Sequence, residues 1–270
     1  MIGIFDSGLG GLTIFKSLIK DLPSYDYIYL GDNARVPYGT RSFDIIYQYT
    51  QEAVDYLFRQ GCVLIILACN TASAIALRKI QQEYLPRYYP QNRVLGVLIP
   101  AAEEAAQITK NKKIGVIGTE ATIKSKTLLE EIKKRDKKIK VYQNACPLLV
   151  PLIETNKLNW RGLDDLLKEY LEPLKKKGID TLILGCTHYA LIKKPIQRII
   201  GQKVKLVSED EIIVPKLKDY LKRHPEIEKR LTKNSQRRFL TTAYSQNFEH
   251  QVKLFMRGAK DIKFELVSLV

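Results

Sequence analysis

The stretch LIILACNT at residues 64–71 places a cysteine directly after an unbroken apolar run. The stretch TLILGCTH at residues 181–188 repeats this order: an apolar run, a small residue, a cysteine and two hydrogen-bonding side chains. Short apolar runs that end in small and polar residues are typical of strands buried in a parallel sheet. Both stretches therefore predict a strand whose carboxyl end carries Cys69 or Cys186.

Similar short runs, rich in β-branched residues, alternate with segments of helical periodicity along the rest of the chain. This alternation is typical of parallel strands joined by crossover helices. The sequence therefore predicts an α/β fold with mainly parallel sheets. The predicted strands are residues 2–5, 27–30, 63–68, 94–98, 114–117, 139–142, 181–184 and 204–207.

Two segments show a clear 3.6-residue spacing of apolar side chains. The first covers residues 43–58, with Ser42 as the N-cap and Gly61 as the stop at the C-terminal end. The second covers residues 163–174. We expect Pro173 to kink or break this second helix, because proline cannot donate a backbone hydrogen bond.

The chain has 270 residues, of which 45% are hydrophobic and 27% are charged. This composition excludes a disordered tail, a collagen-like repeat and a disulfide-stapled miniprotein. The four cysteines form no C-x-x-C pair, so we expect reduced thiols and neither a disulfide framework nor a zinc knuckle. Apolar runs such as residues 62–69 are too short to cross a bilayer, and the N-terminus shows no export signal, so we expect a cytoplasmic protein without a membrane partner.

The charge balance favours anionic partners, because 44 Lys and Arg against 29 Asp and Glu leave a net charge of +15. Nucleic acid is one such partner, and an acidic metabolite is another. The lysine runs at residues 110–113, 133–140 and 175–177 stand at the ends of predicted helices or before strands, where solvated charges are ordinary. No helix-turn-helix, RNP-like or C2H2 pattern is present, so we do not expect a nucleic-acid partner.

The two matched cysteines are candidates for chemistry. Ligands of parallel sheets bind at the carboxyl ends of the strands. A thiol at that place also lies beside the N-terminus of the following helix, where a thiolate is favoured. Cys62 and Cys146 lack this setting and are expected to be small buried hydrophobic residues.

A glycine-rich turn, DSGLGGLT at residues 6–13, follows the first predicted strand. It does not match the dinucleotide fingerprint, because counting from Gly8 places Thr13 where the third glycine is required. The turn remains suited to an anion at a helix N-terminus. Asp6 has two interpretations: a carboxylate that caps the turn, or a charge directed into a cleft.

Five blocks of sequence, in the same order, closely resemble the cofactor-independent aspartate/glutamate racemase family. The resemblance spans about residues 1–207, and the five blocks together are far more specific than any single glycine or cysteine motif. The blocks are residues 3–11 (GIFDSGLGG), 31–39 (GDNARVPYG), 68–73 (ACNTAS), 115–122 (GVIGTEAT) and 185–189 (GCTHY).

The resemblance implies two α/β domains of pseudo-symmetric design that face each other across a cleft. The first lobe would comprise residues 1–94 and 208–270 and carry Cys69. The second would comprise residues 95–207 and carry Cys186. The active site would lie in the interdomain cleft.

The same resemblance implies an isomerase that interconverts L-glutamate and D-glutamate, supplies D-glutamate for peptidoglycan, and needs neither a cofactor nor a metal. The first cysteine would act on the D enantiomer with help from Asp6, and the second on the L enantiomer with help from His188. Glu154 would lie near the second cysteine. The substrate contacts implied by the family pattern are Asp6, Ser7, Tyr38, Gly39, Asn70, Thr71, Thr119, Glu154, Thr187 and His188.

The chemistry explains why two thiols are needed. Racemisation removes the Cα proton from one face and returns a proton to the other, so one ionised and one protonated group are required on opposite sides. Thiols titrate close enough to neutral pH for both states to coexist in one site. Hydrogen-bond donors such as Ser7, Asn70, Thr71 and Thr187 would hold the α-carboxylate as charge flows into it.

Some alternatives remain open at this point. Aspartate is a rival substrate within the family. Cys69, Cys186, His188 and Asp6 have the right types to converge on zinc, although their spacing matches no zinc motif. The sequence departs from the family pattern at residues 207–210 (VSED), at residues 241–244 (TTAY) and at Ala190, which leaves the hinge and the C-terminal packing undetermined. A homodimer is expected from the family.

Overall fold

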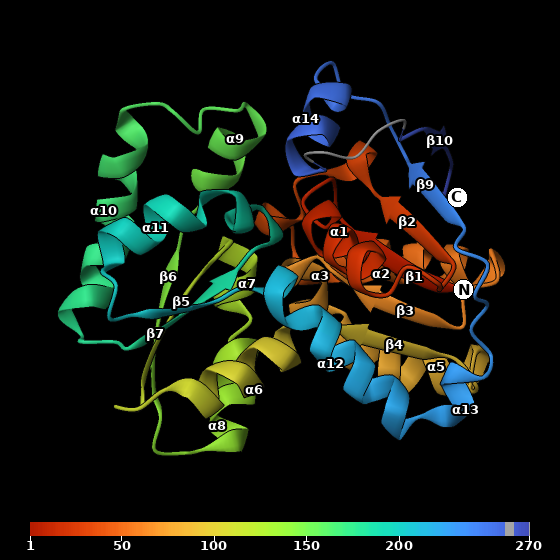
Figure 1. Ribbon diagram of the computed structural model, residues 1–270, viewed down its shortest axis with the longest axis horizontal. Coiled ribbons are helices and arrows are strands. Elements are labelled where there is room, and N and C mark those ends of the chain that lie inside the picture. Colours follow the sequence, from red (N-terminus) through yellow and green to blue (C-terminus); the bar gives the residue numbers. More distant parts are fainter. Residues whose placement is uncertain (257–261, 270) are drawn as a thin grey trace.

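The computed structural model describes residues 1–256 and 262–269. Within these residues the strands form two sheets, one of six strands and one of four, and every pair of neighbouring strands is parallel. Figure 1 shows the two sheets side by side, each with helices packed against it. The predicted α/β fold with mainly parallel sheets is confirmed.

The larger sheet has the strand order β10-β9-β2-β1-β3-β4. Its outer strands β9 and β10 come from the C-terminal part of the chain, which returns to this sheet after the smaller sheet is complete (Figure 1). The bounds are β1 (Ile2–Asp6), β2 (Tyr27–Gly31), β3 (Leu64–Leu67), β4 (Arg93–Gly96), β9 (Arg237–Thr241) and β10 (Phe264–Leu266).

The smaller sheet has the order β6-β5-β7-β8. It lies between β4 and β9 in the sequence, so the chain enters it once and leaves it once. The bounds are β5 (Lys113–Gly118), β6 (Lys140–Ala145), β7 (Thr181–Gly185) and β8 (Lys205–Val207).

The longer helices cover both faces of each sheet. Ile4 and Ile66 pack in one core cluster with residues of α1, while Ile65 and Leu67 pack in another with residues of α2. Strands that are buried on both faces explain the unbroken apolar runs in the sequence. The longer helices are α1 (Leu12–Asp21), α2 (Phe43–Arg59), α6 (Leu98–Ile108), α8 (Thr127–Arg135), α10 (Gly162–Lys176), α11 (Lys193–Ile200), α12 (Glu209–Arg223) and α14 (Phe248–Phe255).

Shorter helical segments connect these elements. They are the α-helical segments α3 (Asn70–Ile75), α4 (Leu77–Lys79), α5 (Leu85–Tyr88), α7 (Glu120–Lys124), α9 (Leu149–Glu154) and α13 (Pro225–Glu228). The 3₁₀ segments are η1 (Asn33–Arg35), η2 (Tyr38–Thr40) and η4 (Thr187–Ile192), and η3 (Ile80–Tyr84) is π-helical.

The two predicted helices are present, with one correction. The first begins after Ser42, whose hydroxyl accepts the backbone N–H of Ile45, and the chain leaves it through Gly61 at φ +86°. The expected break at Pro173 is wrong, because α10 runs through it to Lys176. Buried apolar side chains on either side, such as Leu171 and Leu174, hold this helix against its sheet despite the missing hydrogen bond.

Strand register brings the predicted site residues together. Phe5 pairs with Leu67, so the residues that follow β1 and β3 emerge side by side at one edge of the larger sheet. Gly118 pairs with Gly185, so Thr119 and Cys186 emerge together from the smaller sheet. Ligand sites of parallel sheets form at such carboxyl edges.

The sequence pattern does not predict β9 and β10, which both join the larger sheet. The predicted domain boundary at residue 94 falls within β4, which continues to Gly96 in the larger sheet. The division into residues 1–94 with 208–270 and residues 95–207 stays a prediction. Among the helices described here, none combines the length and the apolar character that a membrane span requires.

The departures from the family pattern have defined places in the structure. Ser208 immediately precedes α12 as its N-cap residue. Near the C-terminal end, the Thr242 hydroxyl donates to Asp32 Oδ1 at 2.8 Å and accepts the backbone N–H of Ala34 at 2.9 Å. The TTAY segment thus ties the end of β9 to the loop after β2.

Candidate active site

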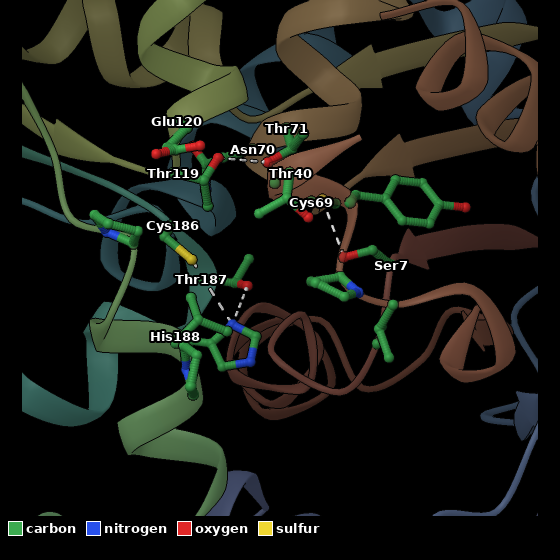
Figure 2. Close-up of a pocket in the computed structure, with 18 of the residues that line it drawn as sticks. Ser7, Thr40, Cys69, Asn70, Thr71, Thr119, Glu120, Cys186, Thr187 and His188 are labelled. Carbon is green, nitrogen blue, oxygen red and sulfur yellow. Dashed lines mark hydrogen bonds between the residues drawn. The ribbon is translucent and has the colours of Figure 1, made fainter. Parts of the chain in front are cut away.

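A pocket of about 310 Å³ lies where the carboxyl edges of the two sheets meet. Figure 2 shows Cys69 and Cys186 approaching it from different sides, with Ser7 beside the first and His188 beside the second. All candidate residues except Asp6 line this pocket. They are Ser7, Tyr38, Gly39, Cys69, Asn70, Thr71, Thr119, Glu154, Cys186, Thr187 and His188.

Cys69 is the residue immediately before α3 and is 6% exposed. Its thiol donates to Ser7 Oγ at 3.3 Å (Figure 2). Burial raises the pKa of Cys69 to about 12; the nearby Asp6 carboxyl raises it as well, and this effect is larger than the lowering by the hydrogen bond with Ser7. The helix N-terminus acts in the expected direction, since the Ala72 backbone N–H lowers the pKa of Cys69, but desolvation outweighs it.

Asp6 lies behind the pocket rather than in its wall. Its Oδ2 accepts the backbone N–H of Gly8 at 3.0 Å, and the residue is 1% exposed. Burial raises the pKa of Asp6, while His188 and the backbone N–H groups of Gly8 and Gly11 act in the opposite direction. The carboxyl group of Asp6 is thus the anion that the glycine-rich turn holds, which favours the capping interpretation.

Cys186 directly follows β7 of the smaller sheet and directly precedes η4. His188 Nδ1 lies 3.7 Å from Cys186 Sγ, and His188 Nε2 lies 3.0 Å from Glu154 Oε1. Burial lowers the pKa of His188, but its hydrogen bonds to Cys186 and Glu154 outweigh burial and raise the pKa to about 10. His188 is therefore protonated at neutral pH and donates from both ring nitrogens.

Gly10 permits the close approach of the two halves of the site. A Cβ atom at this position would lie 2.3 Å from Thr187 Oγ1 and 2.5 Å from His188 Nδ1. Such distances are far below van der Waals contact. The glycine in the turn after β1 therefore fixes where the His188 ring lies.

Three threonine hydroxyls join the larger and the smaller sheet at another wall of the pocket. Thr71 Oγ1 lies 2.9 Å from Thr119 Oγ1 and 3.2 Å from Thr122 Oγ1, and the last two are 3.0 Å apart. Thr119 also caps α7 by accepting the Thr122 backbone N–H. Gly39 packs against Thr119, since a Cβ at Gly39 would lie 2.8 Å from the Thr119 Cβ.

Tyr38 shapes the pocket with its ring rather than its hydroxyl. The hydroxyl donates to Asp32 Oδ2 at 2.5 Å, and Arg35 Nε donates to the same oxygen at 2.7 Å. Tyr38 is 1% exposed, and burial together with Asp32 raises the pKa of its hydroxyl well above the usual value. It stays neutral at all ordinary pH values.

Several lining residues were not chosen from the sequence. Cys146 was expected to be a small buried residue, and it is 1% exposed, yet it borders the pocket. Glu120 lies within the block at residues 115–122, and nothing else in the sequence marks it as a site residue. The full set of missed lining residues is Gly8, Val36, Pro37, Thr40, Glu120, Cys146, Pro147, Val150 and Pro151.

The charge of the pocket differs from that of the whole chain. Among the described residues that line it, the charged ones are Glu120, Glu154 and His188, and none is lysine or arginine. The +15 net charge is therefore carried outside this pocket. In the part of the chain that the structure describes, no three His, Cys, Asp or Glu side chains are grouped so as to hold a metal ion, which argues against the zinc alternative.

Comparisons with known proteins show the family to which the chain belongs. Residues 12–214 match the family model described as Asp/Glu/Hydantoin racemase. A glutamate racemase from Sulfurihydrogenibium sp. is 44% identical over 269 residues, which cover 99% of this chain and 98% of that protein. The crystal structure of a Bacillus anthracis glutamate racemase matches with a TM-score of 0.90 at 36% identity, covering 100% of this chain and 97% of the other.

A glutamate racemase from Francisella tularensis, in complex with D-glutamate, matches with a TM-score of 0.88 at 36% identity. That match covers 99% of this chain and 97% of the other. The agreement thus extends over the full length in both sequence and structure. The chain belongs to the Asp/Glu/Hydantoin racemase family, whose members are isomerases.

Proposed function

We propose that this chain is a glutamate racemase that interconverts L-glutamate and D-glutamate by proton transfer between Cα and two cysteines, Cys69 and Cys186. The observation that carries the proposal is that both thiols line one pocket, each at the carboxyl end of its own sheet. Groups on opposite sides of Cα are what inversion requires.

The substrate assignment is supported by the relatives and by the polarity of the pocket. The matched proteins are glutamate racemases, and the one from Francisella tularensis binds D-glutamate. The pocket offers hydroxyl and amide groups to the substrate carboxylates, together with one imidazolium and two carboxylates in its lining. A small amino acid with both positive and negative groups fits this mixture.

The surroundings of the two thiols support different roles for them. Cys186 is the base of the proposed scheme, because its Sγ lies 3.7 Å from Nδ1 of His188. Cys69, with a pKa raised to about 12 by burial and by Asp6, rests as a thiol. The protein thus holds one base and one acid, which face the same pocket.

Conversion of L-glutamate begins with this resting pair. The Cys186 thiolate removes the Cα proton as the Cα–H bond breaks and an S–H bond forms. Cys69 then delivers its thiol proton to the opposite face of Cα and becomes a thiolate. The product is D-glutamate, and the two sulfurs have exchanged protonation states, so the reverse reaction begins from Cys69.

The carbanion that forms between these steps needs stabilisation of the α-carboxylate, into which its charge flows. Ser7, Asn70 and Thr187 supply polar side chains to the pocket. A well-placed donor of this kind lowers such a barrier by about 3 kcal/mol. Several donors acting together are therefore needed.

The proposed role of the product is to supply D-glutamate for peptidoglycan in the cytoplasm. A homodimer is the proposed assembly. The family relationship supports both proposals, and the proton-transfer scheme depends on neither of them.

The experiment is to incubate the purified protein with each glutamate enantiomer in deuterated water, following optical rotation together with deuterium at Cα. We expect the inverted product to carry solvent deuterium, and we expect Cys69→Ala and Cys186→Ala to abolish inversion. Cys62→Ala is the matched control, because Cys62 is also buried but does not line the pocket. Inversion without deuterium uptake would refute the two-thiol scheme, and inversion of aspartate alone would refute the substrate assignment.

A further inference from the structure

The C-terminal helix α14 belongs to the half of the molecule built on the larger sheet. Its residue Phe248 packs against β10 of that sheet, since the ring centroids of Phe248 and Phe264 lie 4.9 Å apart. Figure 1 shows α14 facing α9, which lies between β6 and β7 in the chain and belongs to the half built on the smaller sheet. Contacts from α14 to α9 and η4 therefore join the two halves.

Two side chains of α14 make such contacts. Gln251 Nε2 donates to the backbone carbonyl oxygen of Glu154 at 3.3 Å. The ring centroid of Phe255 lies 5.2 Å from that of His188, and the two ring planes are 87° apart, an edge-to-face arrangement. Residues 251 and 255 are four positions apart, so their side chains lie on the same face of the helix.

The two partners of this helix face are themselves paired. His188 Nε2 lies 3.0 Å from Glu154 Oε1, and His188 Nδ1 lies 3.7 Å from Cys186 Sγ. One face of α14 thus contacts both members of the pair that stands beside the second thiol. Neither Gln251 nor Phe255 is among the described residues that line the pocket, so any effect of theirs on the chemistry passes through this pair.

The imidazole of His188 is confined from more than one side. Phe255 and His188 are both buried, so the contact between their rings lies in the interior of the protein. At another side of the ring, the turn after β1 comes so close that a Cβ at Gly10 would lie 2.5 Å from Nδ1. Because protein interiors are close-packed, the volume of the Phe255 ring restricts rotation and tilting of the imidazole.

We propose that Phe255 is a positioning residue that holds the His188 ring so that its Nδ1 atom stays directed at Cys186 Sγ. Gln251 supports the same geometry by holding the backbone of Glu154. This inference rests on the proposed function, because it needs Cys186 as a proton-transfer group. Misplacement of such a group by about 1 Å lowers a rate about 100-fold, so the ring contact should affect proton transfer rather than substrate binding.

The test compares Phe255→Leu with Phe248→Leu, a matched control from the same helix. Both variants remove one buried aromatic ring, but the ring of Phe248 packs against Phe264 of β10. We expect Phe255→Leu to lower kcat about 10- to 100-fold for both glutamate enantiomers and to change KM less than about threefold. We expect Phe248→Leu to lower the melting temperature to a similar extent while kcat stays within about twofold of the wild type.

Deuterium at Cα of the substrate gives a readout that a structural role would not move. In the proposed scheme, Cys186 removes this hydrogen from L-glutamate and Cys69 removes it from D-glutamate. A slower step at Cys186 should raise the primary isotope effect on kcat/KM for deuterated L-glutamate. It should lower the isotope effect for deuterated D-glutamate, because the step at Cys69 then limits the rate less.

A double-mutant cycle with His188→Asn isolates the ring contact. Without the imidazole, Phe255→Leu has no ring to position and should cause no further loss of kcat. If Phe255→Leu does not fold, Gln251→Ala takes its place in the cycle, because Gln251 is only partly buried. We expect Gln251→Ala to lower kcat about threefold, in line with one lost hydrogen bond, and to have no effect in the His188→Asn background.

The inference is overturned if Phe255→Leu and Phe248→Leu lose kcat equally, if both isotope effects keep their wild-type values, or if the loss is unchanged in the absence of the imidazole. Failure of the proposed function looks different, because the wild-type protein would then not invert glutamate with uptake of solvent deuterium.

Discussion

The Nδ1 atom of His188 lies 3.7 Å from the Sγ atom of Cys186, whereas the thiol of Cys69 contacts the neutral hydroxyl of Ser7. The two thiols that line the pocket therefore differ in their electrostatic surroundings. In the mechanism that we propose, this difference makes one sulfur the base and the other the acid before a substrate arrives. The predictions below follow from it and from the packing that maintains it.

Replacing His188 by asparagine removes the cation beside Cys186. We expect kcat/KM to fall about 100-fold, because the thiolate loses its charged partner. The fall should be equal for both enantiomers, since their equilibrium constant is one. Circular dichroism of the reaction mixture measures both directions, and activity within twofold of the wild type would contradict the role given to His188.

Replacing Glu154 by glutamine removes the carboxylate that lies 3.0 Å from His188 Nε2. Glu154 helps to raise the pKa of His188 to about 10, so this pKa should fall in the variant. The imidazolium is required for activity, and it is lost as the pH rises through that pKa. The alkaline limb of the kcat/KM profile should therefore move to lower pH by about one unit.

The control for this profile is Glu120→Gln. Glu120 also lines the pocket, but it pairs with Lys124 at 3.9 Å and has no bond to His188. Its profile should coincide with that of the wild type. A shift in the Glu120 variant as large as in the Glu154 variant would point to a general charge effect of the pocket instead.

Replacing Gly10 by alanine should displace the His188 ring, because the new Cβ would lie 2.5 Å from Nδ1. A displacement of about 1 Å in such a group is enough to lower the rate about 100-fold. Gly162→Ala is a suitable control, since its Cβ meets the exposed ring of Trp160 outside the pocket. Steady-state kinetics with thermal unfolding of both variants checks this prediction, which fails if the Gly10 variant keeps full activity.

Replacing Cys146 by alanine should leave racemisation within about threefold of the wild type. Burial raises the pKa of the Cys146 thiol to about 12 and outweighs the Gly118 backbone hydrogen bond that lowers it, and the thiol donates to the Asn144 carbonyl oxygen at 3.8 Å. We expect a loss of about 1 kcal/mol in the free energy of unfolding, measured by urea denaturation, for the cavity left in the core. A Cys146 variant as inactive as Cys186→Ala would assign proton transfer to the third thiol.

The fold could be predicted wherever local sequence alone determines an element. The β1, β3 and β7 strands are buried on both faces, so their apolar runs are visible without knowledge of the fold. By contrast, β9 begins with Arg237 and Arg238 and becomes a strand through its pairing with β2, a contact between distant parts of the chain. The helix continues through Pro173 for the same reason, since its tertiary packing outweighs the backbone hydrogen bond that proline cannot make.

The site residues could be predicted where they directly follow a strand or lie in one of the five motif blocks. Cys69 and Cys186 stand at matched strand ends, and both reach the pocket. The two interpretations of Asp6 could not be separated from sequence, because the choice depends on whether the Gly8 N–H lies close enough to bind it. The burial of Glu209 could not be predicted, since it depends on how α12 packs.

The most direct test of the central claim is a crystal structure of this protein with D-glutamate bound. We predict that the substrate Cα lies in the pocket with the Sγ atoms of Cys69 and Cys186 on its opposite faces, each about 3.5 Å from it. Both sulfurs on one face of Cα, or either sulfur too far away to reach it, would contradict the account.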